Sequence, residues 1–155
     1  MLITKRPWHL WAISIFLIFM YSMGIYDFFM MLSHNSIYYA SKGFGEAVVS
    51  YFTNYPFYIM VFWIANLICG FVAPVLLLMN KKQATIVALI SVIADIILIV
   101  STVLFRNRIE ALGINIFIFD IFILIITLGL YLYCKLVAFR SQWIHIKNEH
   151  NNQLK

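Results

Sequence analysis

Three aspartates stand alone inside long apolar stretches of the sequence, where a charged side chain is energetically costly. They are Asp27, Asp95 and Asp120, and Asn66 has a comparable place in another apolar stretch. An acid surrounded by hydrocarbon needs a partner or a function, such as a proton relay or ligand binding. These four polar residues are therefore the candidates for chemistry, and the stretches that hold them determine which chemistry is available.

The composition places the chain in a lipid bilayer. Of its 155 residues, 64% are hydrophobic and only 11% are charged, whereas soluble domains are close to half apolar and one quarter charged. A soluble chain of this length cannot bury such a surplus, so we expect lipid to cover it. The net charge of +5 comes from bases beside or between the apolar stretches, which indicates membrane topology and no nucleic-acid partner.

Four segments are long enough to cross the membrane as helices: residues 8–32, 56–79, 83–105 and 112–137. At 1.5 Å per residue, ~20 residues cover the ~30 Å hydrocarbon core of a bilayer. The continuous apolar runs exclude a β-barrel, which needs alternation. We expect an all-α membrane four-helix bundle in residues 1–139 and a polar cytoplasmic tail in residues 140–155. Residues 33–55 form a loop, with a short helix expected over 46–52.

The basic residues predict the orientation of the bundle. With the N-terminus inside, the cytoplasmic face collects Lys5, Arg6, Lys81, Lys82, Lys135, Arg140, Lys147 and Lys155. The outer face holds only Lys42, Arg106 and Arg108. Cytoplasmic segments near the membrane are enriched in Lys and Arg, so we expect both termini in the cytoplasm.

The four polar residues all fall between the middle and the outer end of their spans. Asp95 lies ~18 Å from the cytoplasmic end of its span, and Asp120 lies ~12 Å from the outer end. Since no base lies at their depth in the sequence, we expect both carboxyls to be protonated at neutral pH. A neutral acid suits proton coupling, or binding of a lipophilic cation or polar solute. The alternative is that these acids only hold helices together, through hydrogen bonds worth about 0.6 to 2 kcal/mol.

Asp27 is nearer to the outer interface than the other two acids. Three residues of the outer rim, His34, Arg106 and Arg108, are candidate partners within reach of Asp27. Structural or capping roles remain open for Asp27, because water can reach an acid at this depth.

The sequence lacks signatures of catalysis and of metal binding. It contains no H-E-x-x-H, no G-x-S-x-G and no nucleotide-binding glycine loop, and its His and Cys residues lack metal-site spacing. Cys69 and Cys134 form no C-x-x-C pair, so we expect them to be packing residues. The chain is therefore not expected to be an enzyme, and we expect neither a cofactor nor a metal.

Several motifs are distributed over most of the chain: Pro7-Trp8-His9-x-Trp11, Gly24-x-x-Asp27, Tyr55-Pro56, Trp63 and Gly70. Together they resemble a group of small proteobacterial four-helix inner-membrane proteins, which are commonly uncharacterised or carry an automatic "sugar transporter" label. Met20-Tyr21 stands where that group has Trp-Asn, and Asp27-Phe28 stands where it has Asp-Tyr. The resemblance implies a bacterial inner membrane and makes Asp27 the acid of the motif.

The leading functional hypothesis is a small inner-membrane transporter of a small solute. Its outward-facing polar pocket would be formed by Asp27, Asn66, Asp95 and Asp120. Because one copy offers few helices around a pathway, transport would require a homo-oligomer. The alternative is a non-transporting accessory or scaffold protein, which binds another membrane protein through a small-residue stripe in the second span. That stripe consists of Asn66, Gly70, Ala73 and Pro74.

Overall fold

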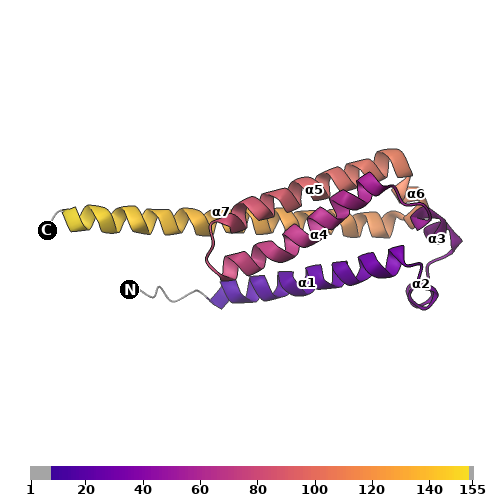
Figure 1. The fold of residues 1–155 in the computed structure, drawn as a ribbon, viewed down its shortest axis with the longest axis horizontal. Helices are drawn as coiled ribbons and strands as arrows, with labels where there is room; N and C mark the ends of the chain where they lie inside the picture. The colour runs from indigo at the N-terminus through magenta and orange to yellow at the C-terminus, as the bar shows by residue number, and fades with distance from the viewer. Residues whose placement is uncertain (1–7, 154–155) are drawn as a thin grey trace.

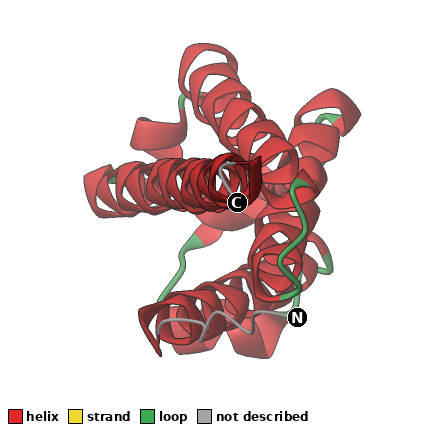
Figure 2. Cartoon of the chain, turned by 90° about the vertical axis from the view of Figure 1, so that its left-hand side faces the viewer, coloured by secondary structure: helices red, strands yellow, loops and turns green. Residues whose placement is uncertain are grey.

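Four long helices and three short ones make up the computed structural model, which describes the backbone of residues 8–153 and the side chains of residues 8–137 (Figure 1). The long helices are α1 (Trp8–Leu32), α4 (Phe57–Leu78), α5 (Gln83–Arg106) and α7 (Ile114–Gln153). The short helices α2 (Ser36–Lys42), α3 (Glu46–Phe52) and α6 (Arg108–Leu112) gather at one end of the bundle. Within residues 8–153 the structure contains helices and connecting loops but no strand (Figure 2).

The long helices agree with the four predicted spans. Each is long and apolar enough to cross a membrane, α7 through its segment Ile114–Val137, which indicates a multi-pass membrane protein. The fourth begins at Ile114 and not at Leu112, because Gly113 has a φ of 87°. Glycine adopts this left-handed conformation readily, and here it separates α6 from α7. The start of α1 and the end of α7 lie at the same end of the bundle, opposite the short helices (Figure 1).

The segment between α1 and α4 is more helical than predicted. The expected helix over residues 46–52 is α3, but α2 was not anticipated. Asn35 begins α2, since its side chain accepts a hydrogen bond of 2.9 Å from the backbone N–H of Tyr38. Gly43, with a φ of 68°, ends it. An Asn cap followed by a terminal glycine is a sequence signal for a helix, so α2 could have been found.

The short helices cover one end of the bundle. Five buried residues of α2 and α3 form a separate hydrophobic cluster: Tyr38, Tyr39, Val48, Tyr51 and Phe52. Leu32, Trp63 and Leu112 from the long helices and α6 pack against it. We refer to α2, α3 and their loops, residues 33–56, as the cap.

The small-residue stripe of α4 lies inside the bundle. Asn66, Gly70, Ala73 and Pro74 are all buried. A Cβ atom added to Gly70 would lie 2.0 Å from the Tyr21 ring of α1, so only glycine allows this close approach. The stripe is therefore occupied within the chain and is not the exposed surface that the accessory hypothesis requires.

Several predicted features fall outside these observations. Lys5, Arg6 and Pro7 lie outside the described residues, as does Lys155. The tail predicted for residues 140–155 continues α7 as a helix to Gln153.

Candidate functional site

A cavity of ≈ 450 Å³ lies between the four long helices and the cap. Asp27, Asn66, Asp95 and Asp120 all line it, although they come from four different helices. Small-molecule sites commonly have volumes of roughly 300–1,000 Å³, so the cavity is large enough for a ligand. It is bounded mainly by apolar and aromatic side chains, among which the four polar residues stand apart.

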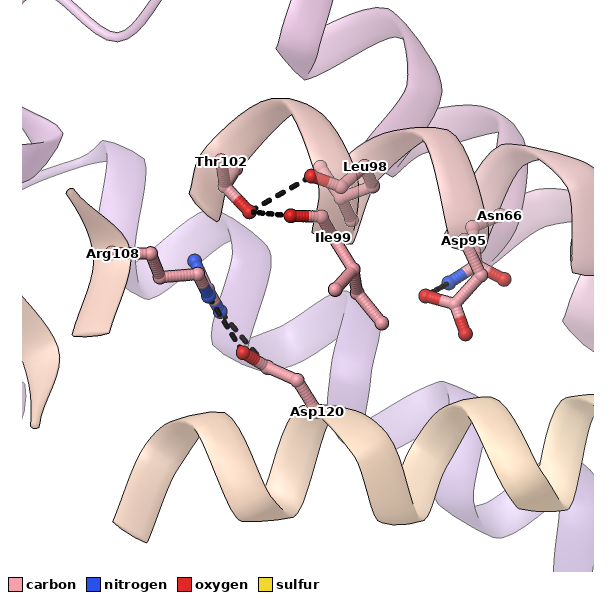
Figure 3. A network of polar contacts seen from close by, with 7 residues as sticks. All are labelled: Asn66, Asp95, Leu98, Ile99, Thr102, Arg108 and Asp120. Carbon is pink, nitrogen blue, oxygen red and sulfur yellow. Dashed lines mark hydrogen bonds and ion pairs between the residues drawn. The ribbon is translucent and has the colours of Figure 1, made fainter. Parts of the chain in front are cut away.

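Asp95 is a buried acid of this cavity, with only 4% of its surface exposed. Asn66 Nδ2 donates a hydrogen bond of 2.9 Å to Asp95 Oδ1, and Ser91 Oγ donates one of 2.7 Å to Asn66 Oδ1. Ser91 thus fixes the amide of Asn66. The NH₂ group of Asn66 faces Asp95 (Figure 3). The second oxygen, Asp95 Oδ2, is buried and has no hydrogen-bond partner among the described side chains.

Asp120 has a basic partner, contrary to the expectation that no base lies at its depth. Arg108 of α6 donates from Nε to Oδ2 at 2.6 Å and from Nη2 to Oδ1 at 2.9 Å (Figure 3). Such a bidentate contact is among the strongest forms of an Arg–carboxylate ion pair. Burial disfavours the charge of Arg108, but the hydrogen bonds and negative charge of Asp120 outweigh it and raise the pKa of the guanidinium above its usual range. Asp120 is therefore paired with a base through two hydrogen bonds and does not stand alone in the wall of the cavity.

Asp27 contacts a residue of the cap and not one of the three outer-rim candidates. Asp27 Oδ1 accepts a hydrogen bond from the Tyr38 hydroxyl of the cap. Burial, followed by the hydrogen bond and charge of Asp27, raises the pKa of Tyr38 above its usual value, so Tyr38 remains a donor. Arg106 instead donates to the Tyr51 carbonyl, and His34 lies 3.4 Å from Thr53 Oγ1 within the cap.

Replacing Tyr38 with phenylalanine should loosen the cap. The substitution removes the O–H that satisfies Asp27, and an unsatisfied, partly buried acceptor costs about 1–3 kcal/mol. Thermal unfolding in detergent should show the loss. Tyr26→Phe is the matched control, because Tyr26 is 47% exposed and its ring lies beside that of Tyr38. Equal stability of the two variants would show that the Asp27 contact does not hold the cap.

Tyr21 is a site residue that the sequence reasoning missed. Its hydroxyl lies 2.8 Å from Thr127 Oγ1 and bridges α1 to α7. Nearer the N-terminus of α1, His9 Nδ1 lies 2.7 Å from the Tyr133 hydroxyl and makes a second bridge between these helices. The spacing of Tyr21 three residues before Gly24 and seven before Phe28 places it on an inward helical face, which was the available signal.

The cavity thus contains one buried acid that makes no ion pair with a described residue. Arg108 and Asp120 neutralise each other, and Asp27 accepts from Tyr38. Asp95 has only the Asn66 amide, so an incoming proton or ligand donor would complete its hydrogen bonding. No protein-family model matches the chain, and it has no significant similarity to a curated protein or to a solved structure.

Proposed function

We propose that the protein binds a small solute in this cavity and exchanges it for a proton on Asp95, as a transporter of the bacterial inner membrane. The cap would lie on the outer side and both termini in the cytoplasm. This orientation is supported by the sequence, in which eight bases flank the apolar spans on the predicted cytoplasmic side and three on the other. The resemblance of Gly24-x-x-Asp27 to the motif of inner-membrane proteins supports the same location.

The observation that carries the proposal is the unpartnered Oδ2 of Asp95. A bare carboxylate buried in an apolar site is strongly disfavoured, so this oxygen should carry a proton when the cavity is empty. A cation or hydrogen-bond donor that reaches Asp95 would favour the ionised form and release that proton. Proton and solute then compete for one carboxyl, which is the basis of coupled exchange.

The number of helices bears on how a transport pathway could form. Four spans enclose the cavity only partly, so we propose that transport requires a homo-oligomer. The alternative function, an accessory protein that binds a partner through the small-residue stripe of α4, is less well supported. Its small-residue stripe is buried against the rest of the bundle.

Proteoliposomes that contain an internal pH dye test this function. Tetraphenylphosphonium, glucose and alanine would be added as probes of three chemical classes, and at least one should change the internal pH in vesicles that carry the protein. Asp95→Asn keeps the size and the Asn66 contact but cannot release a proton, so it should abolish the signal. Asp95→Glu should retain it in part.

The matched control is Glu110→Gln, which also removes an acid but on the exposed surface of α6, away from the cavity. It should behave as the unmodified protein does. If no probe moved protons, or if Asp95→Asn and Glu110→Gln gave the same signal, proton exchange at Asp95 would be wrong.

A further inference from the structure

The exposed residues among those lining the cavity show where it opens. Four of the lining side chains are exposed: Phe19, Met23, Lys42 and Phe119. Phe19 and Met23 belong to α1 and are 64% and 46% exposed, while Phe119 of α7 is 57% exposed. The opening therefore lies between α1 and α7, with Lys42 of α2 at its edge toward the cap, and its other edges are apolar.

The other directions are covered by protein. Toward the cap, the cavity is bounded by Tyr38 and Phe52, which are 7% and 3% exposed. Away from the cap, the Tyr21–Thr127 contact joins α1 to α7. On the remaining side, α1 packs against α4, α4 against α5 and α5 against α7. The cavity thus meets its surroundings through the side of the bundle, where a membrane protein faces lipid.

The lining indicates the charge that the cavity accepts. Three carboxyls, Asp27, Asp95 and Asp120, face it together with two bases, Arg108 and Lys42. Arg108 is engaged by Asp120, and Lys42 lies at the exposed edge, with Nζ 5.4 Å from the centre of the Tyr38 ring. Eight of the 26 lining residues are aromatic, and the faces of aromatic rings attract cations.

We propose that the occupant is a lipophilic organic cation that enters from the hydrocarbon of the membrane through the slot between Met23 of α1 and Phe119 of α7. This inference rests on the proposed function and names its substrate class and route. An apolar body passes between apolar edge residues without losing hydration, and its positive charge then pairs with Asp95 in a site that excludes water. A sugar would have to lose the water bound to its hydroxyl groups at the same edge. It carries no charge whose pairing with Asp95 could offset this desolvation cost.

Two probes of the same shape and opposite charge test the substrate class. Tetraphenylphosphonium and tetraphenylborate both partition into membranes, so their binding can be compared in lipid nanodiscs with and without the protein. Tetraphenylphosphonium should bind saturably, and tetraphenylborate should not. Asp95→Asn should weaken the binding of the cation by about tenfold or more, the size expected for losing one charge contact of ~1.4 kcal/mol, while Glu110→Gln should leave it unchanged.

Substitutions at the slot test the route. Met23→Trp combined with Phe119→Trp narrows the opening and should slow association of tetraphenylphosphonium in stopped-flow measurements by about tenfold. Phe119→Ala widens it and should accelerate association. Phe16→Trp and Phe122→Trp are the matched controls, because both residues are 52% exposed on the same helices and do not line the cavity. Size-exclusion chromatography would first establish that every variant is folded.

The outcomes separate the two proposals. If the cation binds through Asp95 but associates at equal rates with the slot variants and the control variants, entry through the slot is wrong. The proposed proton exchange at Asp95 is then unaffected. If both probes bind alike, or if the cation does not bind, the substrate class is wrong. A change of internal pH on addition of glucose or alanine would then still support proton exchange at Asp95. If none of the three solutes changed the internal pH of the proteoliposomes, the proposed transport function would be wrong as well.

Discussion

Arg108→Gln should destabilise the protein by about 3–5 kcal/mol, the usual cost of removing one partner from a buried ion pair. The side chains of Arg108 and Asp120 are only 16% and 17% exposed. Without the guanidinium, the Asp120 carboxylate loses two charged donors at 2.6 and 2.9 Å and remains in an apolar wall of the cavity. The free energy of unfolding, measured by SDS titration in mixed micelles, should fall accordingly.

The double variant Arg108→Gln/Asp120→Asn distinguishes this mechanism from a general loss of packing. Because it removes both charges, it should recover much of the stability lost in the single variant. Lys81→Gln removes an exposed base in the turn between α4 and α5 and should change stability by less than about 0.5 kcal/mol. Equal stability of the single and double variants would show that the unpaired carboxylate is not the cause.

Gly70→Ala should destabilise the bundle by about 1–3 kcal/mol, as overpacking of a tight core does. The new Cβ would lie 2.0 Å from Cε1 and 2.1 Å from Cζ of Tyr21, so the ring or the helix must move. Displacing the ring also separates its hydroxyl from Thr127 Oγ1, now 2.8 Å away. We therefore expect both lower thermal stability and a wider α1–α7 gap.

Gly129→Ala is the matched control for this substitution, because a Cβ at Gly129 of α7 meets no atom within 4 Å. It should be neutral or stabilising by up to about 1 kcal/mol, since alanine favours helix more than glycine does. In a Tyr21→Ala background, Gly70→Ala should add almost no further loss. A full additional loss there would mean that Tyr21 is not the side chain that requires the glycine.

The spans could be predicted from the sequence because hydrophobic length is a local property. A run of apolar residues in a bilayer can satisfy its backbone only as a helix, so the composition of residues 83–105 already implies α5. The depth of Asp95 along its span follows in the same way from a rise of 1.5 Å per residue. Neither inference requires knowledge of how helices pack.

The partners of the acids could not be predicted, because they depend on turns outside the spans. Arg108 precedes Asp120 by twelve residues. The positive φ angles of Asn107 and Gly113, at the two ends of α6, turn this helix so that the Arg108 side chain faces α7. Tyr38 reaches Asp27 after a reversal at His34, whose φ is 51°. A count of bases by their depth in the sequence places Arg108 at the outer rim of the bundle. Its long side chain, held on a short helix, nevertheless reaches inward to the cavity.

The length of α7 has a mechanical consequence. Its 40 residues form a rod of ~60 Å, about twice the thickness of the hydrocarbon core. Leu130 and Cys134 are its buried anchor points in the bundle. Phe119 lies ~16 Å from Leu130 along the rod and Gln153 lies ~35 Å from it on the other side. If the rod pivots at this anchor, a 1 Å widening at the slot would swing the far end by ~2 Å in the opposite direction, so occupancy of the cavity could be sensed outside the membrane.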